Sequence, residues 1–330
     1  MDFRLGKNVS QDFIENKLLW DEDAEIKKTA KKVSRTAKIK VKHCYLCGNS
    51  KSKKECSFYG INYLRCKNCS LVYADRRLSE NQLQNYYEND THYDATASYA
   101  DKKLLRIREE VVKPKILFMK KYAKGKNWLD VGSADGSALS VIKKESFNPV
   151  GIELNESSRL FAKKHRNFDL YSKPLSDFVK ENKLKFNVIS FFGVIDLIPD
   201  PMNELKLANK LLNKNGIVGI NVPNFDSVST QVQKLITSPD RHLEPSSMLM
   251  QYNQKSLEFA LKKSGFKPLA TWYFGMDVIE LLKFIRIKIN HFENSEIDLT
   301  LRNHLNSIQT IFDTNHLGDQ IFMIGRKISQ

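Results

Sequence analysis

Residues 128–137 of the chain read WLDVGSADGS, the pattern of a buried strand that turns tightly into a helix. The acid Asp130 lies near the end of the apolar run, and Gly132 and Gly136 frame the turn. Glycines there let backbone N–H groups approach a ligand without a Cβ in the way. Residues 150–153, VGIE, predict a second strand that also ends in an acid. Ligands of open parallel sheets bind at the carboxyl ends of the strands, so these strand ends predict a ligand site.

The residues at the two strand ends favour a nucleoside that carries a positive charge. A dinucleotide fingerprint needs Gly-x-Gly-x-x-Gly, whereas residues 132–136 supply only Gly-x-x-x-Gly. Asp130 would repel a pyrophosphate and suits a cationic ligand instead. Glu153 can accept hydrogen bonds from both hydroxyls of a ribose, and it leaves little room for a 2′-phosphate. Together these features predict an adenosyl site.

Strands and helices alternate from residue 127 onward, which implies an α/β fold with a parallel sheet and helices on both faces. Strands are expected at residues 128–131, 149–153, 169–171, 186–192 and 216–222, the third of them weak. Helices are expected at residues 137–145, 156–165, 202–212 and 253–264. The last two strands are expected at residues 268–274 and 320–328.

Further motifs follow the glycine turn in a fixed order. After Asp130, Gly132, Gly136 and Glu153 come FNVIS (186–190), VIDLIPDP (194–201), LLNKNG (211–216), INVPN (220–224) and SGF (264–266). This ordered set, over about residues 120–330, resembles class I S-adenosylmethionine-dependent methyltransferases. The resemblance implies a Rossmann-like seven-stranded methyltransferase sheet with S-adenosylmethionine as the cofactor.

The same resemblance implies which residues bind the cofactor. Asp130, Gly132 and Gly136 would hold the methionyl end, and Glu153 the ribose. Leu154 would lie beside the adenine and Leu175 at its edge, with plain core packing as the alternative for both. The full set of expected cofactor-binding residues is Asp130, Gly132, Ser133, Gly136, Glu153, Leu154, Leu175, Phe191, Phe192, Gly193 and Tyr93.

Four of the five cysteines form two pairs, Cys44-x-x-Cys47 and Cys66-x-x-Cys69, separated by residues 48–65. This spacing is typical of a four-thiolate zinc site, and four thiolates leave no open position for water, so the ion would be structural. A domain of about 30 residues needs such an ion to fold. A degenerate site and an iron centre are the alternatives. Cys56 and His43 fall outside the pattern.

The chain divides into four parts by composition and motif. Residues 1–42 are expected to be a helical or partly disordered basic arm, and residues 43–75 a zinc ribbon. Residues 76–123 are expected to be a helical linker or cap over the cofactor site, with a helix broken at Pro114. Residues 124–330 would form the methyltransferase domain, with insertions at about 225–250 and 277–312.

The order of these parts resembles that of one subgroup of these methyltransferases. A cysteine ribbon, then LVYAD (71–75), then Tyr86, Tyr87 and Tyr93, then the methyltransferase motifs, is similar to a bacterial subgroup. That subgroup includes deoxysugar C-methyltransferases and enzymes from polysaccharide and natural-product clusters. The resemblance implies a small-molecule acceptor, a sugar or nucleotide-linked sugar of surface-glycan or secondary-metabolite biosynthesis.

Methyl transfer to oxygen or carbon also needs a base near neutral pKa. The histidine candidates are His92 and His242, with a surface role as the alternative for each. Tyr87 and Tyr93 would stack on the cofactor or bind substrate, unless they only pack, and Arg241 would clamp a substrate anion. Relatives often carry Glu-His where this chain has Asp196 and Leu197, which argues against a divalent-ion mechanism.

Two rival functions stay open, the first suggested by the net charge of +15 and the second by the missing Glu-His pair. One is an RNA methyltransferase whose ribbon and basic arm bind nucleic acid, and the other is a non-catalytic S-adenosylmethionine-binding module. Spread lysines, rather than arginine forks, favour a solvated surface over a phosphate-reading one. The sequence also has no apolar run long enough to span a bilayer and no signal-like start, so we expect a cytoplasmic protein. The oligomeric state is left open.

Overall fold

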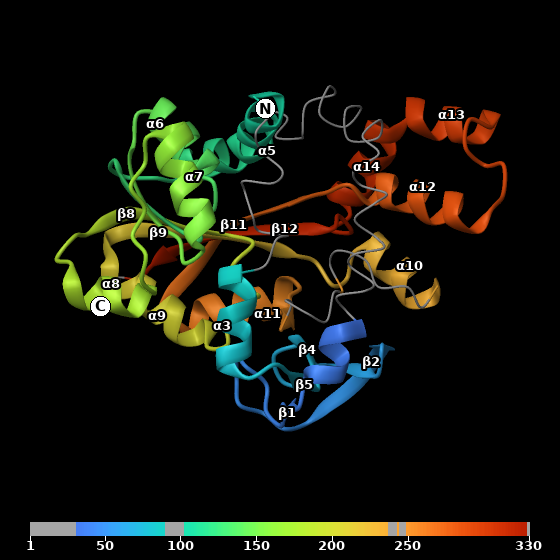
Figure 1. The fold of residues 1–330 in the computed structure, drawn as a ribbon, viewed down its shortest axis with the longest axis horizontal. Coiled ribbons are helices and arrows are strands. Elements are labelled where there is room, and N and C mark those ends of the chain that lie inside the picture. Colours follow the sequence, from blue (N-terminus) through green and yellow to red (C-terminus); the bar gives the residue numbers. More distant parts are fainter. Residues whose placement is uncertain (1–30, 90–101, 237–242, 244–248, 329–330) are drawn as a thin grey trace.

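The computed structural model describes residues 31–89, 102–236, 243 and 249–328 of the chain (Figure 1). Helices lie above and below one large sheet, and a smaller sheet lies beneath the lower helices. Residues 1–30 of the expected basic arm lie outside the described residues.

The large sheet has the strand order β11-β12-β9-β8-β6-β7. Strands β7, β6, β8 and β9 run parallel, and β12 runs antiparallel to both of its neighbours. The predicted α/β class is confirmed. The six strands are β6 (Asn127–Val131), β7 (Asn148–Ile152), β8 (Phe186–Phe192), β9 (Leu212–Pro223), β11 (Phe266–Phe274) and β12 (Gln320–Lys327).

The expected third strand, residues 169–171, makes only an isolated bridge between Tyr171 and Ile152. The Tyr171 amide donates to the carbonyl oxygen of Gly151, and the Glu153 amide donates to that of Tyr171. Pro174 follows three residues later and cannot donate a ladder hydrogen bond. The described sheet therefore has six strands, and a short extended segment occupies the place of a seventh.

Helices cover both faces of this sheet (Figure 1). On one face, Ile116, Met119 and Ile142 pack with Trp128 and Phe322 of the strands. The helices of this side are α5 (Lys102–Lys120), α6 (Ser137–Lys144) and α7 (Glu156–Arg166). Those of the other side are α8 (Leu175–Glu181), α9 (Pro201–Leu211) and α11 (Gln254–Lys263). No helix in the described ranges is both long enough and apolar enough to cross a bilayer.

The helix break expected at Pro114 is wrong, because α5 continues through this residue. Proline lacks the backbone N–H and disfavours a helix interior. Val112 and Ile116, on either side of Pro114, are both buried in the cluster that α5 forms with α6 and the sheet. Burial of this apolar face outweighs the lost backbone hydrogen bond.

The cysteine-containing segment forms a second, antiparallel sheet, which we call the ribbon sheet. Its order is β10-β4-β3-β2, from β2 (Ser52–Phe58), β3 (Ile61–Cys66), β4 (Val72–Ala74) and β10 (Met250–Gln251). Strand β10 comes from a distant part of the chain, after β9. A contiguous core of buried residues also joins this sheet to the large one. The segment expected at residues 43–75 is thus built into the α/β domain rather than appended to it.

The segment just before the ribbon sheet is also packed. Residues 31–36 are helical, and Val33 and Ala37 are buried in the shared core. Strand β1 (Ile39–Lys40) then pairs with β5 (Arg76–Arg77), ahead of helix α3 (Glu80–Asn89). The end of the expected arm is therefore part of the folded core.

The remaining helices gather beyond one end of β11 and β12 (Figure 1). Residues 277–312, expected as a helical excursion, contain α12 (Asp277–Lys288), α13 (Glu296–Asn303) and most of α14 (Leu305–Thr314). The insertion expected at residues 225–250 contains α10 (Val228–Ile236), which contacts α12. These helices extend the end of the sheet at which the parallel strands finish.

Candidate cofactor site and cysteine cluster

The glycine turn after β6 is held tightly against the end of β7. Gly132 has φ +76° and Gly136 has φ +75°, in the left-handed region that favours glycine. A Cβ on Gly132 would lie 2.3 Å from Cγ2 of Val194. The amides of Gly132 and Ser133 both donate to the Ile152 carbonyl oxygen, at 2.9 Å each. The turn thus needs glycine for both its backbone conformation and its close approach to the loop after β8.

Asp130 lies inside the protein, on the face of β6 that it shares with Trp128. The Ser190 hydroxyl donates to Asp130 Oδ1 at 2.5 Å, and Trp128 Nε1 donates to Ser190 Oγ at 2.8 Å. Burial raises the pKa of Asp130 to about 7. The carboxyl therefore links β6 to β8 just before the turn.

Glu153 directly follows β7 and joins the glycine turn to the start of α7. Its Oε2 accepts from the Ala134 amide and its Oε1 from the Asn155 amide, both at 2.8 Å. Burial raises the pKa of Glu153, although these backbone hydrogen bonds oppose the shift. Glu153 as a whole residue is half-buried, and its carboxylate accepts from two backbone donors.

A buried ion-pair network ties the turn to the helices above it. Arg166 Nη2 lies 3.2 Å from Asp135 Oδ2, and Arg166 also pairs with Glu109 of α5. The Ser137 hydroxyl and amide donate to Asp135 Oδ1, at 2.7 and 3.1 Å. Sequence reasoning missed this network. Its only signal is an acid inside a glycine turn together with the basic last turn of α7.

The other residues expected near the cofactor divide into two groups. Leu154 is 41% exposed beside Glu153, Phe192 is half-buried, and a Cβ on Gly193 would meet no atom within 4 Å. Leu175 and Phe191 are instead buried in the core, at 2% and 0% exposed. For Leu175 this is the packing role that the sequence left open. Glu153, Leu154 and Gly193 thus present a carboxylate, an apolar surface and open space, which fits an adenosyl ligand.

The remaining expected residues lie outside the described part of the chain. They are the catalytic candidates His92 and His242, the aromatic Tyr93 and the basic Arg241. Tyr87 is described, and its hydroxyl donates to the Leu197 carbonyl oxygen at 3.0 Å. Its hydroxyl therefore binds the loop after β8.

Asp196, where relatives carry an acid, is buried rather than exposed at the site. It is 1% exposed, and among the described residues its Oδ1 has no hydrogen-bond partner. Burial raises its pKa to about 7. The amide of Met250 in β10 donates to the Asp196 carbonyl oxygen at 3.3 Å. Asp196 therefore lies between the loop after β8 and the ribbon sheet.

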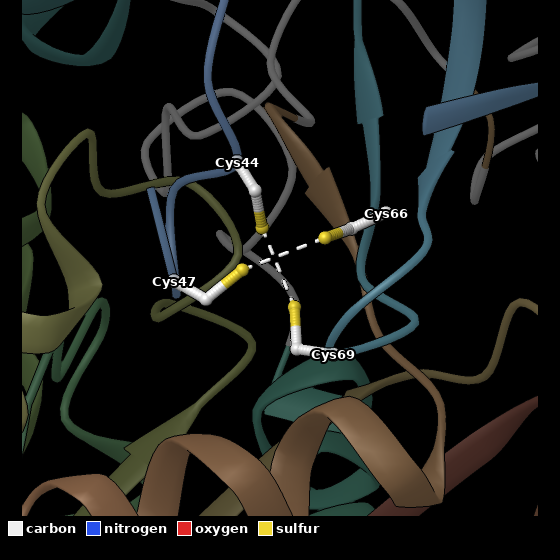
Figure 2. Close-up of side chains that lie close together, drawn as sticks. All are labelled: Cys44, Cys47, Cys66 and Cys69. Carbon is white, nitrogen blue, oxygen red and sulfur yellow. Dashed lines mark hydrogen bonds between the residues drawn. The ribbon is translucent and has the colours of Figure 1, made fainter. Parts of the chain in front are cut away.

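The four paired cysteines point their sulfur atoms toward a common centre (Figure 2). All four sulfurs lie within 4.8 Å of one another, with Cys44 and Cys69 at 3.4 Å and Cys47 and Cys66 at 3.5 Å. A disulfide needs about 2.05 Å. Zinc–sulfur bonds of about 2.3 Å in a tetrahedron place the sulfurs about 3.8 Å apart. The cluster therefore has the dimensions of a tetrahedral thiolate site rather than of two disulfides.

The two cysteine turns have the same backbone form. The Gly48 amide donates to the Cys44 carbonyl oxygen at 2.9 Å, and the Ser70 amide to that of Cys66 at 3.1 Å. Gly48 and Ser70 both adopt left-handed backbone, with φ of +68° and +65°. The hydrogen bond from the Cys69 thiol lowers the pKa of Cys44 to about 5 and raises the pKa of Cys69, so Cys44 is the thiolate of this pair. These residues fit a thiophilic cation.

Comparisons with known proteins agree with this architecture. A family model described as a methyltransferase domain matches residues 104–271, just over half of the chain. No curated protein matches the sequence significantly.

Three solved methyltransferases are similar to the chain. One, a SAM-dependent methyltransferase from Archaeoglobus fulgidus, is 17% identical over 69% of this chain and 100% of that one, with a TM-score of 0.47. Magnesium protoporphyrin IX methyltransferase from Synechocystis PCC 6803 with bound SAH is 12% identical over 76% and 100%, with a TM-score of 0.48. The plantazolicin methyltransferase BamL is 12% identical over 75% and 98%, with a TM-score of 0.45.

The family match includes the glycine turn, the acid at the end of β7 and strands β6 to β9. It covers the elements from which the site is built, together with the helices α5 to α9 that pack on them. The chain belongs to the methyltransferase-domain family and is a class I S-adenosylmethionine-dependent methyltransferase.

Proposed function

We propose that this enzyme methylates a sugar or nucleotide-linked sugar of surface-glycan or secondary-metabolite biosynthesis, with its cofactor bound at the carboxyl ends of β6, β7 and β8. The observation that carries the cofactor site is Glu153, a half-buried residue whose carboxylate is joined to the glycine turn by the Ala134 amide. The sugar-like acceptor is supported by the order of cysteine ribbon and methyltransferase motifs in the sequence. The cytoplasmic location stays a prediction.

The residues around the turn have separate roles in this proposal. Glu153 binds the ribose hydroxyls, and Leu154 packs on the adenine. Asp130, Gly132, Ser133 and Gly136 shape the turn that receives the methionyl end. Phe192 and Gly193 border the sulfonium side. Bound S-adenosylmethionine supplies an activated methyl group on a sulfonium.

The protein's contribution to the chemistry is then mostly alignment. Holding the acceptor in line with the methyl group at contact distance supplies much of the rate enhancement. The described residue Asp196 is 1% exposed, so its carboxyl is not accessible to a bound acceptor. We assign the removal of a proton from the acceptor to His92 or His242, and both assignments stay predictions.

The cysteine cluster is proposed to hold a structural zinc ion. Cys44, Cys47, Cys66 and Cys69 would fill all four positions of a tetrahedron and leave none for water or substrate. The ion therefore takes no part in methyl transfer. Its role is to fold the ribbon sheet onto the α/β domain.

A turnover assay with acceptor panels tests this function. The enzyme is incubated with methyl-labelled S-adenosylmethionine and either nucleotide-linked sugars or total RNA. Transfer to a sugar that changes little between 50 and 200 mM salt supports the proposal. Transfer to RNA that falls steeply with salt would replace it with the nucleic-acid alternative, which the charge of +15 leaves open. Cofactor binding without transfer to any acceptor would favour a non-catalytic module.

A further inference from the structure

Asn155 joins two helices that approach the proposed cofactor site from different parts of the chain. It is the N-cap of α7, where its Oδ1 accepts from the Ser158 amide at 2.9 Å. Its side-chain nitrogen donates to the carbonyl oxygens of Tyr87 and Glu88, at 3.1 and 3.0 Å. Those carbonyls belong to the last turn of α3, where helix carbonyl groups have no partner within their own helix.

The same residue also contacts the carboxylate assigned to the ribose. The Asn155 backbone amide donates to Glu153 Oε1 at 2.8 Å. Asn155 is 4% exposed, and both ends of its side-chain amide are used. Three elements of the site therefore meet at one buried residue: the end of β7 at its backbone amide, and the start of α7 and the end of α3 at its side chain.

Only asparagine satisfies these contacts at this position. An N-cap needs a short side chain with an acceptor, which Asn, Asp, Ser and Thr provide. Binding two carbonyl oxygens at once needs an NH₂ group, which of these four only asparagine has. Serine would therefore keep the cap of α7 and lose the connection to α3.

Helix α3 has a second attachment outside the end of β7. The Tyr87 hydroxyl donates to the Leu197 carbonyl oxygen in the loop after β8. At its other end, α3 is closed by a reciprocal capping pair, in which the Ser79 amide donates to Gln82 and the Gln82 amide to Ser79. The C-terminal turn of α3 is thus fixed to the loops after both β7 and β8.

We propose that Asn155 is a positioning residue that couples cofactor binding at Glu153 to the attachment of α3 over the site. A ribose on Glu153 strengthens the geometry in which Asn155 holds α3, and an attached α3 in turn favours the bound cofactor. Such coupling is reciprocal by thermodynamic necessity. The inference rests on the proposed ribose contact of Glu153.

The test combines titration of S-adenosylhomocysteine with amide hydrogen exchange of the full-length protein. In the native protein, saturating S-adenosylhomocysteine is expected to slow exchange in α3. Asn155→Ser is expected to speed α3 exchange about tenfold, to abolish its response to the ligand, and to weaken binding about five- to tenfold. Its unfolding midpoint stays near native because serine keeps the cap, whereas Asn155→Ala lowers the midpoint as well.

Tyr87→Phe provides an independent test of the coupling, because it removes the hydrogen bond between α3 and the loop after β8 and leaves Asn155 intact. It is expected to speed α3 exchange and to weaken S-adenosylhomocysteine binding by a similar factor. The inference is overturned if either variant frees α3 while ligand affinity stays native, or if Asn155→Ser leaves α3 exchange unchanged. Absence of binding to the native protein would instead refute the proposed cofactor site.

Discussion

The Tyr63 hydroxyl of the ribbon sheet donates a hydrogen bond to the Leu243 carbonyl oxygen at 3.1 Å, across 180 positions of sequence. Both residues are fully buried. Nearby, Arg65 pairs with Asp226 at 2.7 Å, and Asn253 donates to the Ser70 carbonyl oxygen at 3.2 Å. The ribbon sheet therefore holds the segment that follows β9 in place.

Metal removal is therefore expected to unfold more than the ribbon sheet. Strand β4 pairs with β10, and both sheets share a core, so loss of the ion should weaken the whole α/β domain. We expect a chelator, or Cys66→Ser, to lower a single calorimetric unfolding midpoint by at least about 5 °C. Cys56→Ser, outside the cluster, should leave it near native. A separate low-temperature transition with an unchanged main one would contradict the shared core.

Asp196 predicts a specific pH dependence of stability. Its folded pKa of about 7 lies above the unfolded value, so its burial destabilises the protein increasingly as pH rises from about 4 to 7. Asp196→Asn is expected to raise the unfolding midpoint by at least about 2 °C at pH 8 and to change it little at pH 4. Asp200→Asn, which keeps the exposed N-cap of α9, is the control. Equal effects at both pH values would contradict the buried, neutral carboxyl.

Two glycines with the same backbone conformation should differ in their tolerance of a side chain. Gly132 and Gly193 have φ of +76° and +70°, but only at Gly132 would a Cβ meet another atom, at 2.3 Å. We expect Gly132→Ala to cost about 3 kcal/mol of unfolding free energy and Gly193→Ala about 1 kcal/mol. Urea unfolding of both variants measures this. Similar losses would show that the turn does not press on Val194.

The strands and helices of the α/β domain could be predicted because each signal is local. Strand β8 was predicted at its observed ends, since the apolar run 186–192 is bounded by lysines and Gly193. Helix α7 was predicted within one residue, as Asn155 caps its start. The spacing of the cysteine pairs likewise predicted that the four sulfur atoms come together.

What the sequence could not reveal depends on contacts between distant segments. Strand β10 is two residues long and exists only because β4 pairs with it. The pairing of Arg166 with Asp135 and the double role of Asn155 leave no periodic pattern. At Pro114, local propensity predicts a break, and packing of α5 against α6 and the sheet overrides it.

The Arg166 network gives a test of this long-range architecture. Arg166 is 4% exposed at its side chain and joins Asp135 to Glu109. Its loss leaves Asp135 with Arg108 at 3.7 Å and Glu109 with Lys144, so the network is weakened rather than removed. We expect Arg166→Met to cost about 1–3 kcal/mol of unfolding free energy. Lys163→Met, in the same helix turn with an exposed partner, should leave the unfolding curve unchanged. A native-like Arg166→Met would refute a role of the network in holding the glycine turn.

Calorimetric titration of S-adenosylhomocysteine into the native protein and Glu153→Gln tests the central claim most directly. The amide of glutamine brings a donor against the Ala134 or Asn155 N–H and removes the charge that binds the ribose hydroxyls. We predict saturable 1:1 binding to the native protein, at least about tenfold weaker binding to Glu153→Gln, and native affinity in Glu156→Gln, an exposed neighbour. Equal affinity in all three proteins, or none in the native one, would contradict a cofactor site at the end of β7.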